Sequence, residues 1–280
     1  MLKSDFVVVA IDQAYQRRQK DAEGDFFRKI SKQSPRTPGG TQQGLYAAAP
    51  NGTLLGFTNN RSPARVQKML LEATEGEIET AEGITDPKRD RRYSPEPPVG
   101  GLVVRMNAKV LDGYDQPKND SEKIFQQAVS RDNLWITKDE HAALVNGTVP
   151  ELLQRRIARF HLVDNTRGEP TMWKDAEIVS CEMSIEGTTL RGKAHLRSRK
   201  GDREFQCELL GRIATKDGQV TRFDVVAKGG FRGEGRYTKR APKGTFPLAI
   251  AFTLADMQDI ADKIPPQGSR GWVDGYMKLR

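Results

Sequence analysis

The sequence predicts two parts of different fold class: an α/β segment over residues 1–75 and an α+β domain with a curled antiparallel sheet over residues 101–280. Three observations favour this division. The chain has 280 residues, which is more than a typical single domain. Residues 176–228 alternate between apolar and polar positions with the period of two that is typical of half-buried strands. Residues 76–100 carry blocks of like charge followed by prolines, as flexible linkers do.

The N-terminal segment is predicted to contain a strand, a helix, a hairpin and a second helix. Phe6–Ile11 is a continuous, β-branched apolar run, which favours a strand buried on both faces. Asp25–Lys32 predicts a short helix. The Asn51-Gly52 pair between two apolar runs predicts a hairpin. Ser62, followed by a proline, is a typical start of a helix. The apolar face of that helix is Val66, Met69, Leu70 and Ala73.

This order of elements resembles the later part of a thioredoxin-like domain. The segments FVVVAID, LYAAAPNGTLLGF and SPARVQKMLLEA carry the resemblance, which covers residues 1–75 and implies an incomplete thioredoxin-like fold. The family's redox dithiol lies on an earlier strand-helix unit, and none precedes Phe6; its cis-proline would fall near Gly44. The resemblance therefore implies a degenerate element without thiol-disulfide oxidoreductase activity, unless an N-terminal CxxC-bearing segment is missing from this chain.

The C-terminal domain is predicted to begin with a strand at Leu102–Val110 and three short helices. Ser121 is expected to cap the first helix. Thr137 and Thr148, each followed three residues later by glutamate, predict capping boxes for the second and third. The first helix carries apolar Ile124, Phe125, Ala128 and Val129. The third is expected to turn Leu152, Leu153 and Ile157 inward and Arg155, Arg156 and Arg159 partly outward.

Four strands of a meander follow between residues 176 and 228, each with one apolar face. The predicted inward residues are Val179, Cys181, Met183 and Ile185; Leu190, Gly192, Ala194 and Leu196; Phe205, Cys207, Leu209, Gly211 and Ile213; and Thr221, Phe223, Val225 and Ala227. Phe246–Leu254 is expected to add a strand, so that with Leu102–Val110 the sheet has about six strands, enough to curl around the helices.

The turns predict how these strands pair. The predicted turns are Glu186-Gly187, Lys200-Gly201 and Lys216-Asp217-Gly218. They set the inward pairs Met183/Leu190, Cys181/Gly192, Leu196/Phe205, Ala194/Cys207 and Gly211/Phe223, and the outward pairs Arg197/Glu204 and Lys193/Glu208. Opposite charges meet in both outward pairs, which agrees with the register that burial demands.

Composition limits the function. The net charge of +8 and a pI near 9.4 favour an anionic partner, or serve only solubility. The two cysteines, Cys181 and Cys207, form no CxxC and fall on inward positions of strands too far apart for a disulfide, so we expect inert thiols. No two of the three histidines have metal-ligand spacing. We therefore expect no metal and no cofactor.

Targeting signals are also lacking. No apolar stretch approaches the roughly 18 residues of a membrane span, and the first residues form no signal-peptide core. We expect a cytoplasmic protein from the chain as given, or an exported one if a leader is missing.

The densest group of reactive side chains lies between residues 159 and 173. His161 with Asp164 could transfer protons, and Arg167 could bind a carboxylate or phosphate, with Glu169 and Trp173 nearby. The alternative is structural: Phe160, Leu162 and Val163 are core, His161 is an outward strand residue, and residues 164–168 form a polar turn.

A second group lies in the glycine-rich stretch 228–240. It interleaves Phe231 and Tyr237 with Arg232 and Arg236, a pattern found on single-stranded nucleic-acid surfaces. The alternative is a mobile loop between strands, which we prefer because such loops are common.

The sequence thus favours a non-catalytic binding or scaffold protein over an enzyme. One alternative is an enzyme acting on an anionic small substrate at His161, Asp164 and Arg167. The other is a nucleic-acid binder that uses residues 228–240. The partner is an anionic ligand or a protein, with nucleic acid possible but not favoured.

Overall fold

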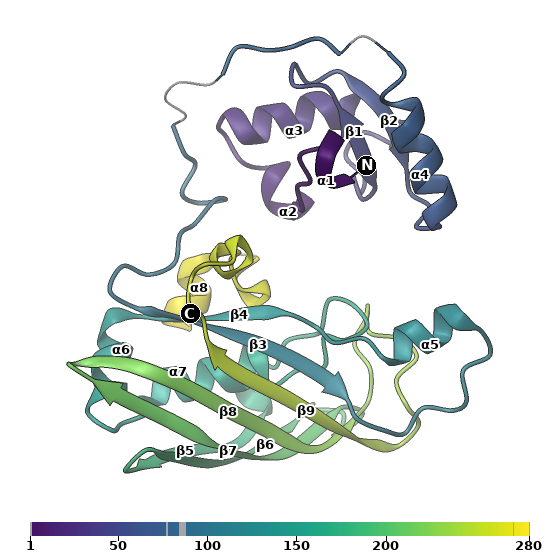
Figure 1. Cartoon of the computed structure of the whole chain (residues 1–280). Coiled ribbons are helices and arrows are strands. Elements are labelled where there is room, and N and C mark those ends of the chain that lie inside the picture. Colours follow the sequence, from purple (N-terminus) through teal and green to yellow (C-terminus); the bar gives the residue numbers. More distant parts are fainter. Residues whose placement is uncertain (1, 77, 84–87, 271, 280) are drawn as a thin grey trace. The chain divides into compact units, whose positions relative to one another are not determined.

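The computed structural model describes residues 2–76, 78–83, 88–270 and 272–279. The chain divides into two compact units, Met1–Pro95 and Glu96–Arg280, each of which is described by itself (Figure 1). Among the described residues, no helix combines the length and the apolar character that crossing a membrane requires.

The N-terminal unit contains a two-stranded sheet and short helices. Its elements are α1 (Leu2–Asp5), α2 (Gln13–Gln16), α3 (Ala22–Lys32), β1 (Leu45–Ala48), β2 (Leu54–Thr58) and α4 (Pro63–Glu72). The predicted hairpin and both helices are confirmed. Met69, Leu70 and Ala73 on the apolar face of α4 pack against Ala47. Ser62 occupies the N-cap position of α4, although its side chain makes no capping hydrogen bond.

The predicted strand at Phe6–Ile11 is wrong. These residues have no regular structure, and Val7, Val8 and Val9 are 93%, 70% and 70% exposed. A strand buried on both faces needs hydrogen-bonded neighbours and covering layers. In the described part of this unit the only sheet is the β1–β2 hairpin, and it does not include this run.

The C-terminal unit is built on a seven-stranded antiparallel sheet in the order β4-β3-β9-β8-β7-β6-β5. Its strands are β3 (Leu102–Val110), β4 (Asp132–Ile136), β5 (Ile178–Glu186), β6 (Thr189–Arg197), β7 (Glu204–Lys216), β8 (Gln219–Arg232) and β9 (Thr245–Leu254). The sheet curls around α6 (Lys138–Val145) and α7 (Glu151–Arg156), as Figure 1 shows. Its concave face and these helices share one apolar core that includes Leu144, Leu153 and Ile157. The curled antiparallel sheet predicted from the sequence is therefore present.

One strand was not predicted. All five residues of β4 are buried, so its sequence does not alternate between apolar and polar positions as a half-buried strand does. Its first two residues, Asp132 and Asn133, are polar, so it also lacks the continuous apolar run that is typical of a fully buried strand. β4 pairs with β3 and forms one edge of the sheet.

The central hairpin of the meander has the predicted register. Leu196 pairs with Phe205 and Ala194 with Cys207. On the outer face Arg197 pairs with Glu204 and Lys193 with Glu208. A slip of one residue would expose the apolar set, and burial of each large side chain contributes about 1.5–3 kcal/mol.

The first hairpin differs from the prediction. Its turn is Gly187-Thr188, one residue later than expected, because Glu186 pairs with Thr189. The register moves by two residues, so that Cys181 lies opposite Ala194 and Met183 opposite Gly192. A bulge between Ile178 and Ser180 turns Ile178 inward and leaves Val179 59% exposed.

The third hairpin also differs from the prediction in its turn and by a bulge. Its turn contains only Asp217 and Gly218, whose φ angles of 52° and 71° suit a tight two-residue turn. A bulge between Ala214 and Thr215 then places Val220 in the core instead of Thr221. Further along, Gly211 lies opposite Val225 rather than Phe223.

The predicted helix caps are right at one of three positions. Thr137 and Glu140 form the capping box of α6. The first helix, α5 (Asp120–Gln126), is capped by Asn119 instead of Ser121. α7 begins after Pro150 and receives no cap from Thr148.

Several side chains of α5 and α7 also point differently from the prediction. Ile124 and Val129 are 71% and 57% exposed, so the first helix does not bury its apolar side chains. Leu152 is 48% exposed, whereas Leu153 and Ile157 are buried as predicted. Arg156, expected partly outside, is completely buried.

The C-terminal residues return to the β3–β4 edge of the sheet. They form two 3₁₀ turns, Ile260–Lys263 and Gln267–Ser269, and the short helix α8 (Val273–Lys278). Asp262 is fully buried and accepts hydrogen bonds from Arg105 and Arg131 at 2.7 and 2.8 Å. These charge-assisted bonds fasten the first turn to β3 and to the residue before β4.

Candidate functional site

His161 lies in the interior of the unit. α7 continues into a π-helical turn, Ile157–His161, which carries the imidazole into the protein. The side chain is completely buried, so its predicted position as an outward strand residue is wrong. Phe160, Leu162 and Val163 are buried as predicted.

The partners of His161 differ from the predicted one. Its Nε2 lies 2.7 Å from the hydroxyl of Tyr276, and its Nδ1 lies 3.4 Å from Oδ2 of Asp132. The Tyr276 hydroxyl also accepts the backbone N–H of Trp135 at 3.3 Å, so its own proton is directed at His161 Nε2. This network assigns the ring proton to Nδ1, facing Asp132. Burial raises the pKa of Tyr276 well above its usual value, so the phenol stays a donor.

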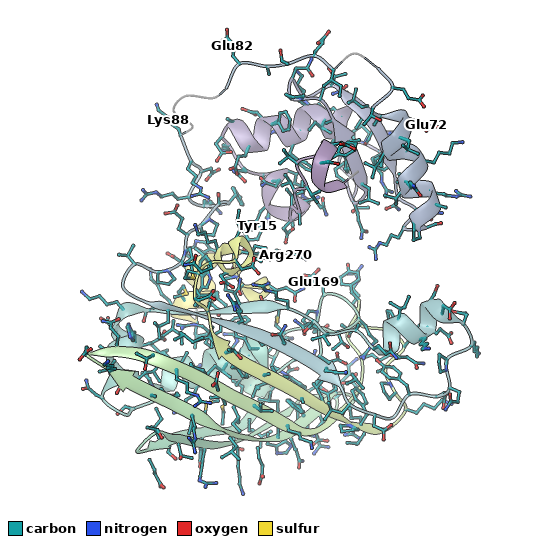
Figure 2. All side chains as sticks on the ribbon, viewed as in Figure 1. Tyr15, Glu72, Glu82, Lys88, Glu169 and Arg270 are labelled. Carbon is teal, nitrogen blue, oxygen red and sulfur yellow. The ribbon has the colours of Figure 1, made fainter. Side chains whose placement is uncertain are left out.

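Asp164 and Arg167 form a separate buried ion pair. Arg167 also donates to the hydroxyl of Tyr114 at 2.9 Å, and Asp164 accepts from Thr166. Arg167 is thus already neutralised by a carboxylate. Glu169 does not take part in this pair, because it forms an ion pair with Arg270 instead; both residues are labelled in Figure 2. The structure does not bring the predicted catalytic residues together at one open site.

The aromatic binding candidates are partly core. Trp173 is 1% exposed, donates its indole N–H to the Leu162 carbonyl at 2.8 Å and stacks under Arg203. Phe231 is 3% exposed and packs between Phe205 and Phe246. Neither ring is available for stacking on a nucleotide base.

The rest of the glycine-rich stretch is divided between strand and loop. β8 extends through Arg232, so residues 228–232 form a strand rather than the expected loop. Arg232 is held by Glu204 at 2.8 Å. Arg236 and Tyr237 lie beyond the strand, with the guanidinium 5.2 Å from the ring, and Tyr237 is 55% exposed.

Both cysteines are free, on β5 and β7. Burial raises the pKa of each thiol to about 12. Thiols with so little thiolate at neutral pH are poor nucleophiles. Within the described residues, no three His, Cys, Asp or Glu side chains are grouped so that they could hold a metal ion.

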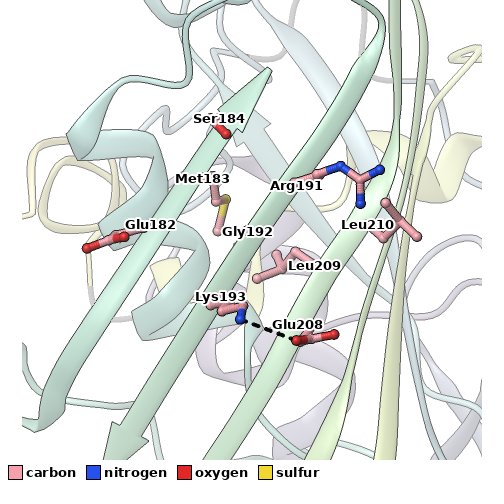
Figure 3. Close-up of a pocket in the computed structure, with 9 residues that line it drawn as sticks. All are labelled: Glu182, Met183, Ser184, Arg191, Gly192, Lys193, Glu208, Leu209 and Leu210. Atoms are coloured by element: carbon pink, nitrogen blue, oxygen red, sulfur yellow. Dashed lines mark ion pairs between the residues drawn. The ribbon is translucent and has the colours of Figure 1, made fainter. Parts of the chain in front are cut away.

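A hollow of about 400 Å³ lies on the outer side of β5, β6 and β7 (Figure 3). Gly192 lies at its centre, and Met183 and Leu209 supply apolar surface. Its polar lining is Glu182, Ser184, Arg191, Lys193 and Glu208. Lys193 and Glu208 pair across it at 3.6 Å, whereas Arg191 makes no ion pair among the described residues. A second cavity, beside Trp173, has a volume of only about 10 Å³ and could hold at most about one water molecule.

The hollow belongs to a wider face on which basic residues outnumber acidic ones. The outward basic residues of β6, β7 and β8 are Arg191, Lys193, Arg197, Arg212, Lys216, Arg222, Lys228 and Arg232. The outward acidic residues of these three strands are Glu204, Glu208 and Asp224, and each pairs with a basic neighbour. Glu182 of β5, which also lines the hollow, makes no ion pair among the described residues. We call this surface the outer basic face.

Comparison with known proteins gives no relative for this chain: no family model, no curated protein and no solved structure matches it.

Proposed function

We propose that this chain is a non-catalytic binding protein whose C-terminal unit binds an anionic partner on the outer basic face. The observation that supports the proposal most is the charge that is left over on this face. Arg191, Arg212 and Lys228 make no ion pair among the described residues, whereas Glu204, Glu208 and Asp224 on the same strands are paired. Glu182 on the neighbouring strand β5 is also without an ion pair among the described residues, so it offsets part of this positive charge. Unpaired basic groups on an open surface attract and orient acidic partners.

The centre of the face favours a protein partner. Leu210 and Val226 pair across β7 and β8 and are 54% and 44% exposed. Apolar side chains surrounded by charged ones are typical of protein–protein interfaces, with an apolar centre and a polar rim. An acidic protein segment with an apolar anchor would satisfy both parts of this surface.

The two alternatives have less support. An enzyme acting through His161, Asp164 and Arg167 would need these groups around one accessible cavity, and all three are buried in two separate networks. A nucleic-acid binder would need several exposed stacking rings, and of the two in residues 228–240 Phe231 is buried and only Tyr237 is exposed. The N-terminal unit contributes, in this proposal, a degenerate thioredoxin-like element, supported by the β1–β2 hairpin followed by α4.

The proposal is tested by reversing charge on the full chain. The variant Arg191→Glu/Arg212→Glu/Lys228→Glu is compared with wild type for binding a fluorescein-labelled peptide of alternating glutamate and leucine. We expect at least a tenfold loss of affinity, and wild-type binding that weakens as salt is raised. The matched control Lys20→Glu/Arg61→Glu/Arg65→Glu changes net charge equally on exposed positions of the N-terminal unit.

Two outcomes would contradict the proposal. One is an equal loss in both variants, which would trace binding to net charge alone. The other is tighter binding of an oligothymidine of the same length than of the peptide, which would favour nucleic acid as the partner.

A further inference from the structure

The side chain of Tyr276 on α8 occupies a closely fitted site. It is 1% exposed and is the buried residue of that six-residue helix. Its hydroxyl meets His161 Nε2 at 2.7 Å and the Trp135 N–H at 3.3 Å. Its ring packs against Phe160 with centroids 5.1 Å apart and faces the guanidinium of Arg156 at 5.4 Å. Every part of the phenol is therefore in contact with a matching group.

The same site also holds the main chain around this tyrosine. Arg156 donates from Nε to the Tyr276 carbonyl at 3.2 Å and from Nη2 to the Met277 carbonyl. Glu140 fixes the guanidinium from the other side at 2.6 Å. A tyrosine side chain and two consecutive carbonyls are bound together, which is how a peptide ligand is recognised: main-chain bonds position it and a pocket selects one side chain.

The site is built from the rigid part of the unit. Trp135 comes from β4, Glu140 from α6, Arg156 from α7, and Phe160 and His161 from the π-helical turn. In this site, Nδ1 of His161 and Oδ2 of Asp132 face each other at 3.4 Å, and neither atom makes any other hydrogen bond among the described residues. A buried polar pair held by so long a contact is incompletely hydrogen-bonded, which is uncommon in a protein interior and calls for an explanation in terms of function.

We propose that Trp135, Arg156, Phe160 and His161 form a binding site for a tyrosine-bearing peptide segment, which α8 occupies within the same chain. When α8 leaves, a segment of the same chemistry from another protein takes its place. The site is separate from the outer basic face, so this inference stands without the proposed function. Selectivity rests on the hydroxyl, because phenylalanine would leave His161 Nε2 and the Trp135 N–H unpaired.

The experiment uses the full chain with Tyr276→Ala, which weakens the internal occupant. The probe is a fluorescein-labelled peptide of sequence Trp-Val-Asp-Gly-Tyr-Met-Lys-Leu, matching residues 272–279, and binding is followed by anisotropy. We expect Tyr276→Ala to bind it at least tenfold more tightly than wild type, whose own α8 competes. The same peptide with phenylalanine for tyrosine is expected to bind at least tenfold more weakly. The control variant Trp272→Ala changes a half-exposed residue next to α8 and is expected to behave as wild type.

The inference is overturned if folded Tyr276→Ala does not bind the tyrosine peptide, binds both peptides equally, or binds no better than wild type. Folding is checked by tryptophan fluorescence. If Tyr276→Ala does not fold, the full chain with Tyr276→Phe replaces it, since that change removes only the hydroxyl. The same order of affinities is then expected, and no gain over wild type would equally reject the inference.

Discussion

Replacing Arg156 is expected to cost the C-terminal unit a large part of its stability. The guanidinium is completely buried and binds Glu140 together with the carbonyls of Trp135, Tyr276 and Met277. Arg156→Met keeps the aliphatic volume but leaves a buried carboxylate and three carbonyls without this donor. Removing one partner of a buried ion pair costs about 3–5 kcal/mol, out of a typical domain stability of about 5–15 kcal/mol.

A second variant separates the two parts of this stability loss, the unpaired charge of Glu140 and the lost hydrogen bonds of Arg156. Glu140 accepts from the Thr137 backbone N–H at 2.9 Å as well as from Arg156. Glu140→Gln keeps an oxygen for Thr137 but removes the buried charge. We therefore expect Arg156→Met/Glu140→Gln to be about 1–2 kcal/mol more stable than Arg156→Met alone.

The assay is equilibrium unfolding in urea, followed by tryptophan fluorescence. The chain has three tryptophans, Trp135, Trp173 and Trp272, and all lie in the C-terminal unit, so the signal reports on that unit alone. The control is Arg155→Met, whose side chain is 37% exposed and pairs with Asp175, and which should cost about 1 kcal/mol or less. A loss below about 1 kcal/mol for Arg156→Met, at an unchanged m-value, would refute the reasoning.

Three further predictions concern the pH response, the strand register and the N-terminal run. The hydrogen bond from Arg105 holds the pKa of Asp262 below its usual value, so the stabilising effect of the ionised carboxylate is present above the unfolded pKa of about 3.9 and is lost as pH falls through the folded pKa. Asp262→Asn should therefore cost about 3 kcal/mol at pH 7 and clearly less at pH 3. An equal cost in urea unfolding at both pH values would argue against this. Ala194→Cys should form a disulfide under mild oxidation, because Ala194 lies opposite both Cys181 and Cys207. The control Ala227→Cys, which lies opposite Leu209, should form none. Intact-mass analysis without reductant measures both variants, and the absence of a disulfide in Ala194→Cys would contradict the register. Val8→Asp should change the free energy of unfolding of the N-terminal unit by less than about 0.5 kcal/mol, because Val8 is 70% exposed. A cost above about 2 kcal/mol, measured by hydrogen exchange or thermal unfolding, would instead support the buried strand of a thioredoxin-like domain.

The sheet could be predicted where the alternating pattern and burial agree. Leu196 and Phe205 pair as expected because a slip of one residue would turn both toward solvent. The same argument does not distinguish registers that differ by two residues, since these keep every side chain on its face. That is why Met183 was placed opposite the wrong partner although it is buried as predicted.

The interior polar network could not be predicted from local pattern. His161 was paired with Asp164, three positions away, but its hydroxyl partner Tyr276 lies 115 positions later and its carboxylate neighbour is Asp132. Arg156 was placed outside because an arginine on a short helix usually is, and its counter-ion Glu140 was identified only as a helix cap. Side chains that meet through the fold leave no spacing signal in the sequence.

The strand order has a consequence for how the C-terminal unit is made. β5 to β9 are successive neighbours in the sheet, so β6, β7, β8 and β9 each pair with the strand synthesised just before them. β3 is different, since Val110 pairs with Leu248, 138 positions later. At a ribosomal rate of about 5–20 residues per second, the β3 edge would wait on the order of ten seconds or more for its partner. An unpaired apolar edge strand is prone to join other chains, so the period between synthesis of β3 and of β9 is when this edge of the nascent chain is most exposed to aggregation.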